Sequence, residues 1–268
     1  AQQSGLAAAV WANQGSPFVD LIYGLPRQHH AGFEETLRKT IAAAPGRIAL
    51  YHYAHLPALF KPQRRIAEAE LPSSEEKARM FETAVAMFAR AGYRHLGLDH
   101  FALEDDELSV AQREGRLHRN FQGYCSHDAG DLIALGVSSI SSVGDVYAQN
   151  DKLLDGYYRR IEHGELPVVR GIALDADDFV RRDAINALMC DFRSDWAALD
   201  ARRGIDSRRW LAGSVDALAP LVDAGAVRVA DRGVEVLPRG RLLVRAVAMD
   251  FDRHLAQSSS GASYSRIA

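Results

Sequence analysis

Residues 18–28 read FVDLIYGLPRQ, an apolar run that ends in a glycine and a proline. A short run of this kind, bounded by turn-forming residues, is typical of a buried strand that leads into a loop. Apolar residues at helical spacing follow over residues 33–44, and a second apolar run covers residues 48–53. Strand, helix and strand in this order predict a parallel sheet with crossover helices, and therefore an α/β fold.

The next part of the chain continues this pattern. Ser73 and Glu76 have the spacing of a capping box, which predicts a long helix that Gly92 ends. A third strand is predicted at residues 94–98. In parallel sheets functional residues gather where strands end and loops begin. Three polar or loop-forming positions lie at or near such ends: Asp20, Ala54-His55 and Asp99-His100.

After about residue 104 the chain changes character and becomes mainly helical. The segment 119–144 is rich in glycine and serine and predicts a structured loop. Helices are expected over residues 105–115, 151–163, 175–190, 208–224 and 239–255, and a hairpin over 227–237. Helices around a small hairpin suggest a winged-helix-like module. The predicted organisation is a leader or junction at 1–17, a barrel part at 18–104, a helical region at 105–256 and a flexible tail at 257–268.

Composition narrows the class of protein. The chain has 268 residues, a net charge of -3 and two cysteines. These values predict no general attraction to nucleic acid, and a reducing, cytoplasmic environment. No apolar run reaches the roughly 20 residues of a membrane-spanning helix. The helical region mixes Arg208 and Arg209 with Asp216 and Asp223, which disfavours a DNA-binding winged helix.

Two polar positions have competing interpretations. Asp20 lies inside an apolar strand, and because a buried carboxylate needs a partner, it is either a structural hydrogen-bonding group or a ligand contact. Asp99 and His100 suggest a carboxylate that orients an imidazole. Because neighbouring residues rarely point at one another, we expect Asp99 and His100 to bond separately.

Five blocks of sequence carry a family resemblance. They are DLIYGLPRQ (20–28), YAHLP (53–57), DHFA (99–102), RNFQGY (119–124) and GVSSIS (136–141). Together they resemble oxygen-independent coproporphyrinogen III oxidase, a radical S-adenosylmethionine (SAM) enzyme of haem biosynthesis. The resemblance starts near Phe18 and covers only the C-terminal portion of that family. It implies a partial radical SAM (β/α) barrel with a mostly helical, winged-helix-like C-terminal domain.

The resemblance also implies roles for individual residues. Asp20, Ala54 and Ile140 would contact SAM, although an apolar residue such as Ile140 is equally typical of a core. Substrate-binding positions are implied at His100, Arg119, Gln122 and Arg181. Arginine and aromatic side chains suit the four propionates and the apolar macrocycle of coproporphyrinogen III. Arg181 is equally expected to form a salt bridge on an exposed helix. No catalytic residue is assigned.

The family's cofactors are SAM and a [4Fe–4S] cluster, which three closely spaced cysteines hold. Cys125 and Cys190 match no part of that motif, so we expect no metal or cluster on this chain, and two free thiols. One interpretation is therefore a partial coproporphyrinogen III oxidase that is inactive alone. The alternative is a non-catalytic remnant that binds a tetrapyrrole or a partner protein. Since a partial barrel exposes the edge of the strand at 18–23, we predict that residues 1–17 or a second chain cover that edge.

Overall fold

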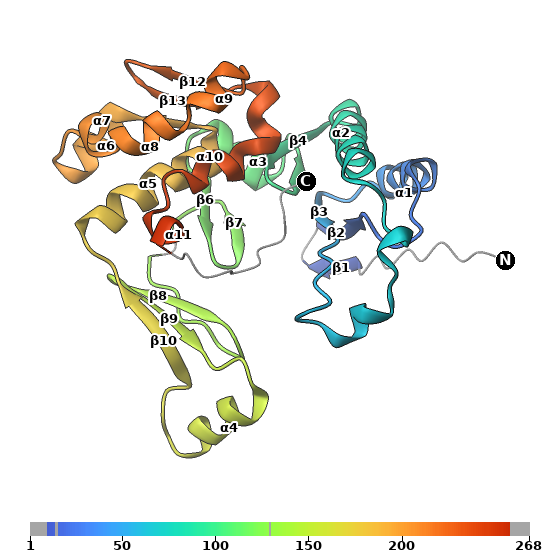
Figure 1. Ribbon diagram of the computed structural model, residues 1–268, viewed down its shortest axis with the longest axis horizontal. Helices are drawn as coiled ribbons and strands as arrows, with labels where there is room; N and C mark the ends of the chain where they lie inside the picture. Colours follow the sequence, from blue (N-terminus) through green and yellow to red (C-terminus); the bar gives the residue numbers. More distant parts are fainter. Residues whose placement is uncertain (1–9, 14–15, 129, 258–268) are drawn as a thin grey trace. The chain divides into compact units, whose positions relative to one another are not determined.

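The computed structural model describes residues 10–13, 16–128 and 130–257. The chain forms two compact units (Figure 1). Unit 1 comprises residues 1–115, 241–249 and 253–268, and unit 2 comprises residues 116–240 and 250–252. Residues 1–9 of the predicted leader and residues 258–268 of the predicted tail lie outside the described residues. The mixture of strands and helices confirms the α/β class.

Unit 1 contains a five-stranded sheet with the order β1-β2-β3-β5-β4. Its strands are β1 (Val10–Asn13), β2 (Ser16–Tyr23), β3 (Arg47–His52), β4 (Tyr93–Gly97) and β5 (His100–Leu103). β2 and β3 are parallel, as the sequence predicts, and β5 runs antiparallel to both β3 and β4. The strand predicted at 94–98 therefore exists, but it does not lie beside β3, because β5 separates the two.

The tight turn between β4 and β5 explains this difference. Gly97 and Leu98 both have positive φ angles, of 144° and 51°. Such a backbone reverses the chain within two residues, so His100 already lies in the returning strand. Leucine rarely adopts this conformation, so Leu98 itself does not predict a turn.

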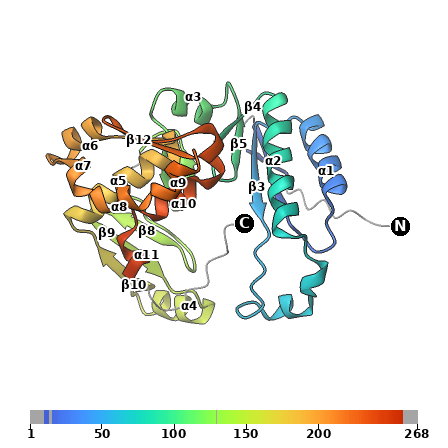
Figure 2. The same ribbon diagram turned by 45° about the horizontal axis from the view of Figure 1, so that its top comes forward.

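Two helices cover one face of this sheet. They are α1 (His30–Ala42) and α2 (Ser74–Arg90), and Figure 2 shows both on the same side of β3. Ser73 caps α2 by accepting a hydrogen bond from the Glu76 amide, as its position in the sequence predicts. The buried side chains of the helices and strands form one core, whose members are Val19, Leu21, Tyr23, Phe33, Leu37, Ile48, Leu50, Met80, Ala84, Phe88, Tyr93 and Phe101.

The edge of β2 is partly covered. β1 pairs antiparallel with the first half of β2, with Val10 opposite Val19 and Asn13 opposite Ser16. The prediction that residues 1–17 cover this edge is thus confirmed for Phe18 and Val19. No strand among the described residues pairs with the same edge over residues 20–23.

The remaining elements of unit 1 are short. The connection from β3 to α2 contains two 3-10 helices, η1 (Lys61–Arg65) and η2 (Glu68–Glu70). The predicted helix at 105–115 is α3 (Glu107–Arg113). The predicted helix at 239–255 is broken into η3 (Pro238–Leu243), α10 (Val244–Met249) and α11 (Arg253–Gln257).

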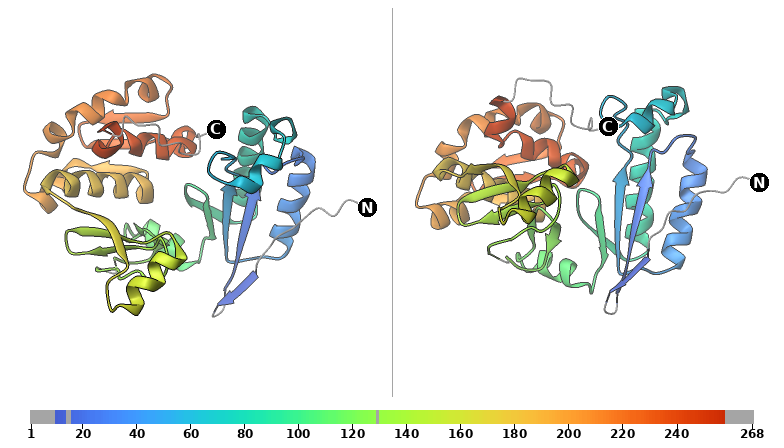
Figure 3. Two further views of the ribbon diagram at one scale, coloured as in Figure 1. Left: turned by 60° about the horizontal axis from the view of Figure 1, so that its bottom comes forward. Right: turned by 90° about the horizontal axis from the view of Figure 1, so that it is seen from below.

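Unit 2 contains three small sheets and six helices in its described residues. Its strands are β6 (His118–Asn120), β7 (Gly123–Cys125), β8 (Ile140–Val143), β9 (Val146–Asn150), β10 (Val168–Ala173), β11 (Arg193–Asp195), β12 (Val227–Ala230) and β13 (Gly233–Val236). Its helices are α4 (Leu154–Glu162), α5 (Ala176–Asp191), α6 (Trp196–Arg203), α7 (Ser207–Trp210), α8 (Ala212–Ala217) and α9 (Ala219–Asp223). Figure 3 shows them from two further sides.

The winged-helix-like prediction fits one part of unit 2. The predicted hairpin is β12 and β13, and β11 adds a third strand beside β13. The helix predicted at 208–224 is instead α7, α8 and α9, with Pro220 in the first turn of α9. The sheet β10-β9-β8 was not predicted, because β8 lies in a segment rich in serine and glycine, and β9 and β10 have no long apolar run.

Candidate functional site

The face of the unit 1 sheet opposite α1 and α2 carries polar side chains. Asp20 on β2 is aligned with Ala49 on β3, and Ala49 is aligned with His100 on β5. Side chains in one such row point to the same face, and so does Tyr51, two residues after Ala49. We call this surface the Asp20 face. It brings together Asp20 and His100, which are 80 residues apart in the sequence.

Asp20 has an orphaned oxygen atom. Its Oδ1 is buried and has no hydrogen-bond partner among the described residues. Burial raises the pKa of this carboxyl, the nearby His100 lowers it, and the charge of Asp99 raises it. The structural hydrogen bond that one interpretation required is therefore not found in the described part of the chain. A buried acceptor without a donor is costly, so the site suits a ligand that brings one.

Asp99 and His100 contact one another directly. His100 Nδ1 lies 2.6 Å from Asp99 Oδ1. The prediction that they bond separately is wrong, because it assumed a continuous strand, whereas Asp99 lies in the turn before β5. The Tyr51 ring lies perpendicular to the His100 ring, with centroids 6.4 Å apart. Burial raises the pKa of Tyr51, and the charges of Asp20 and Asp99 raise it further.

Two glutamines hold the loops that follow the parallel strands. Gln28 Oε1 accepts hydrogen bonds from the Gly24 amide at 2.7 Å and from the Leu25 amide at 3.2 Å. In the loop after β3, Gln63 Oε1 accepts from the Leu56 amide at 2.5 Å, and its Nε2 donates to the Ala54 carbonyl at 3.0 Å. The sequence reasoning missed both glutamines and Tyr51. For Gln28, the only signal was its place at the end of DLIYGLPRQ.

Replacing Gln63 by alanine is expected to loosen the loop that contains Ala54. The variant leaves the Leu56 amide and the Ala54 carbonyl without their side-chain partner, which should lower the free energy of unfolding by about 1–2 kcal/mol. Hydrogen exchange of a peptide covering residues 53–60 should accelerate. Lys61→Ala, an exposed position in the same 3-10 helix, is the matched control. Unchanged exchange in Gln63→Ala would show that Gln63 does not hold the loop.

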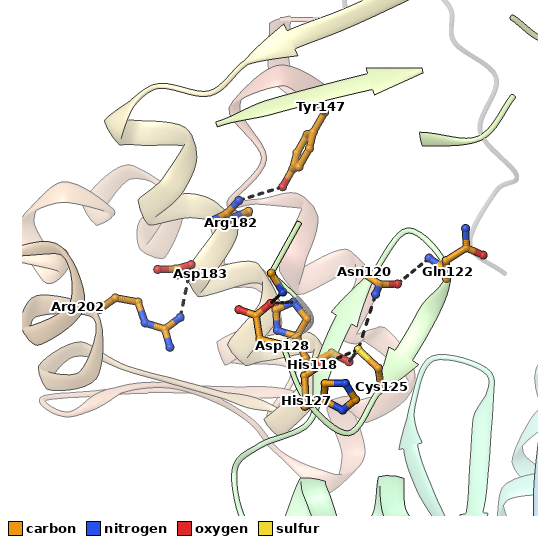
Figure 4. A network of polar contacts seen from close by, with 11 residues as sticks. His118, Asn120, Gln122, Cys125, His127, Asp128, Tyr147, Arg182, Asp183 and Arg202 are labelled. Atoms are coloured by element: carbon orange, nitrogen blue, oxygen red, sulfur yellow. Dashed lines mark hydrogen bonds and ion pairs between the residues drawn. The ribbon is translucent and has the colours of Figure 1, made fainter. Parts of the chain in front are cut away.

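The remaining predicted site residues lie in unit 2. Arg119 on β6 is half-buried, and its guanidinium lies 6.0 Å from the centroid of the Tyr124 ring. Its side chain makes no hydrogen bond within the described residues. The exposed Gln122 donates its backbone amide to Asn120, and its side chain points away from that contact (Figure 4). Ile140 is half-buried at the start of β8.

The guanidinium of Arg181 already contacts three groups within unit 2. Its Nε donates to Asp177 at 2.8 Å, and its Nη1 lies 3.1 Å from Ser214 Oγ and 3.2 Å from the Phe251 carbonyl. These contacts fit the salt-bridge interpretation of Arg181. The neighbouring Arg182 stacks on the Phe179 ring at 4.6 Å and reaches the Tyr147 hydroxyl at 3.5 Å (Figure 4).

Neither Cys125 nor Cys190 forms a disulfide bond. Burial raises the pKa of Cys190 to about 12, and burial also raises the pKa of the half-buried Cys125. Cysteine binds metals and iron–sulfur clusters as the thiolate, so a thiol that stays protonated is a poor ligand. Within residues 10–13, 16–128 and 130–257, no three His, Cys, Asp or Glu side chains gather as a metal site would require.

We expect Cys190 to resist thiol reagents in the folded chain. At pH 8 a thiol with a pKa of about 12 carries roughly a thousandfold less thiolate than an ordinary cysteine. Labelling with a chromogenic disulfide should therefore show one slow thiol, which Cys190→Ala removes. Both thiols should react quickly in denaturant. Fast labelling of Cys190 in the folded chain would contradict its burial.

No helix in the described part of the chain has both the length and the apolar character needed to cross a membrane.

Comparison with known proteins gives a consistent result. Residues 174–243 match the family model described as the HemN C-terminal domain. Oxygen-independent coproporphyrinogen III oxidase from Escherichia coli is 44% identical over 249 residues, which are 93% of this chain and 54% of the relative. The relative of the same name from Synechocystis is 42% identical over 95% of this chain and 56% of its own length.

A solved structure agrees with these relatives. Coproporphyrinogen III oxidase (HemN) from Escherichia coli, reported as a radical SAM enzyme, matches with a TM-score of 0.86 and 44% identity, over 90% of this chain and 56% of that one. The chain thus spans about half the length of these proteins. A relative from Thermostichus vulcanus is 39% identical, and the match covers 92% of this chain and 76% of that relative. This chain therefore belongs to the oxygen-independent coproporphyrinogen III oxidase family.

Proposed function

We propose that this chain forms part of the SAM-binding wall and of the substrate cover of a coproporphyrinogen III oxidase. The reaction would be the oxidative decarboxylation of coproporphyrinogen III to protoporphyrinogen IX. The observation that carries the proposal is the buried Asp20 Oδ1, which has no partner among the described residues. In a chain of this family, such an acceptor suits a cofactor that brings hydrogen-bond donors.

The residues of unit 1 fit SAM. Asp20 would accept a hydrogen bond from a hydroxyl or ammonium group of the cofactor, since a carboxylate only accepts. Ala54 lies in the loop that Gln63 holds, where a small side chain permits close packing. Ile140 of unit 2 would add an apolar contact. SAM, when bound, supplies the adenosyl radical of the family's chemistry.

The residues of this sequence do not fit the [4Fe–4S] cluster. Such a cluster takes three cysteine thiolates, whereas this sequence has only Cys125 and Cys190, whose pKa values burial raises. We assign no step to a cluster on this chain and propose that the chain is inactive alone.

Substrate contacts are proposed for three residues. Arg119 is a half-buried cation without an ion-pair partner among the described residues, so it suits a propionate of coproporphyrinogen III. The exposed amide of Gln122 would add a second polar contact, and His100 would contact the substrate from the Asp20 face. Arg181 is the weakest of the predicted substrate contacts, since its guanidinium already has three partners.

We also propose partners and a cellular location for this chain. We propose that a strand of a second chain pairs with β2 at residues 20–23, since β1 covers only the first half of this edge. Two cysteines that form no disulfide favour a cytoplasmic protein. Mixed charge on the winged-helix-like part, such as Arg208 beside Asp231 at 3.3 Å, disfavours nucleic acid as a partner.

Two titrations test the proposed function. Calorimetry with SAM should show one-site binding to the chain. Absorbance titration with coproporphyrin III, the stable oxidised form of the substrate, should show a shifted Soret band that Arg119→Ala weakens more than Arg116→Ala, an exposed neighbour. Binding of neither ligand would contradict the proposal. Binding of coproporphyrin III without SAM would instead favour a tetrapyrrole-binding protein without enzymatic activity.

A further inference from the structure

Arg182 on α5 carries a charge that no carboxylate of the described residues balances. Its neighbour Arg181 pairs with Asp177, but successive side chains of a helix point in different directions. Arg182 forms no salt bridge within the described residues, and its guanidinium instead stacks on the Phe179 ring at 4.6 Å. Since Arg182 is half-buried, water stabilises its charge only in part. The Arg182 side chain therefore suits an anionic ligand.

The carboxylate next to Arg182 in the sequence already has other partners. Asp183 is buried, and its Oδ2 lies 2.6 Å from Arg203 Nη2 and 2.7 Å from Arg203 Nε. Its Oδ1 lies 3.7 Å from Arg202 Nη1 (Figure 4). Both oxygens of Asp183 thus face arginines of α6. The charge of Asp183 is shared between these two arginines and does not neutralise Arg182.

The Tyr147 hydroxyl provides a second donor beside Arg182. Arg182 Nη1 lies 3.5 Å from this hydroxyl, and because arginine only donates, the Tyr147 oxygen accepts in the contact. Tyr147 makes no other side-chain hydrogen bond within the described residues, so its hydroxyl hydrogen can donate to another acceptor. A guanidinium has five N–H groups, and this contact uses one of those on Arg182. A carboxylate placed here would accept hydrogen bonds from both side chains.

An exposed aromatic ring lies next to these donors. The Phe121 ring stands edge-on to the Tyr147 ring, with centroids 4.9 Å apart. Phe121 is 47% exposed, although phenylalanine is usually buried. It lies in the turn between β6 and β7, the hairpin that also carries Arg119. A cation, a hydroxyl donor and an exposed ring together are complementary to a ligand with a carboxylate on an apolar ring.

We propose that Arg182 and the Tyr147 hydroxyl bind one propionate of coproporphyrinogen III, and that the pyrrole ring bearing this propionate packs against Phe121. The ligand assignment rests on the proposed function, from which the substrate class is taken. Arg182, and not Arg181, is then the arginine of α5 that contacts the substrate. Because the substrate carries four propionates, this site is additional to the one proposed for Arg119.

Absorbance titration of the full chain with coproporphyrin III, and with its tetramethyl ester as the uncharged analogue, tests the site. Arg182→Gln keeps much of the side-chain length and removes the charge, so it should weaken binding of coproporphyrin III about tenfold. It should leave the affinity for the ester unchanged, because the ester has no carboxylate. Arg202→Ala removes the same charge from an exposed side chain and should change either affinity by less than about twofold.

Two further variants decide the test if Arg182→Gln does not fold. Tyr147→Phe keeps the ring contact with Phe121 and should weaken binding of coproporphyrin III alone, by about fivefold. Arg182→Lys keeps the charge but loses the paired N–H groups, so it should also weaken binding of coproporphyrin III but not of the ester. Folded variants that bind coproporphyrin III like the wild type, or that lose affinity for acid and ester equally, overturn the proposal and leave the proposed function standing. A wild type that binds no coproporphyrin III overturns both.

Discussion

Replacing Phe101 by alanine should lower the free energy of unfolding of unit 1 by about 3–5 kcal/mol. Phe101 is 1% exposed, and its ring centroid lies 4.9 Å from the centroids of Phe88 and His95. Truncation removes the apolar surface that joins β5 to α2 and leaves a cavity that the close-packed core fills only in part. Denaturant titration should show an earlier transition, and hydrogen exchange of peptides from β2 and β3 should accelerate.

Two variants make this experiment specific. Phe101→Leu keeps most of the buried volume, so it should cost less than Phe101→Ala. Phe60→Ala removes a ring that is 54% exposed and should change the free energy of unfolding by no more than about 0.5 kcal/mol. Equal losses for Phe101→Ala and Phe60→Ala would show that β5 does not contribute to the core of unit 1.

The DHFA block shows how far the sequence predicts this protein. In the sequence this block serves as one marker of the family. In the structure Phe101 packs into the core of unit 1, whereas His100 points to the opposite face and contacts Asp99. The alternation of side chains along β5 explains why these two neighbours lie on different faces. It was not predicted because the preceding turn depends on Leu98, a residue that rarely takes a positive φ angle.

Unit 2 was harder to predict for a different physical reason. The helix α5 and the β12–β13 hairpin were predicted, because each has a clear apolar period or turn signal. The sheet β10-β9-β8 has no such pattern, since none of the six β10 residues and none of the four β8 residues is buried. A strand that packs only part of one side leaves no continuous apolar run. Its pairing is set by contacts that are distant in the sequence.

For the candidate site, too, the sequence predicted local features but not the contacts between distant residues. Asp20 was predicted as an unusual carboxylate in an apolar strand, because that feature is local. Its proximity to His100 depends on the order of β2, β3 and β5, which the sequence did not reveal. Whether Asp20 is a structural or a ligand-binding group depends on its partners. The absence of a partner for Oδ1 among the described residues favours a ligand.

The Asp20→Asn variant distinguishes these two roles, because we expect it to raise the free energy of unfolding and to lower the affinity for SAM. Burial raises the pKa of Asp20, so the folded chain disfavours the charged carboxylate. Removing this charge should raise the free energy of unfolding at pH 7, by up to about 1 kcal/mol. A raised folded-state pKa means that the folded chain holds the proton more tightly than the unfolded chain. The stability of the wild type should therefore increase as the pH falls from 7 toward about 4, and the advantage of Asp20→Asn should disappear there.

The affinity for SAM should fall in the same variant. A hydrogen bond to a charged group contributes about 1.5–3 kcal/mol, which corresponds to a loss of roughly 10- to 100-fold in affinity. Calorimetry with SAM and denaturant titration at pH 7 and pH 4 measure the two effects separately, and the exposed Asp105→Asn is the matched control. A less stable Asp20→Asn with unchanged SAM affinity would identify a structural carboxylate. A more stable variant with weaker binding is the pattern expected of a residue whose unfavourable burial is retained for its ligand.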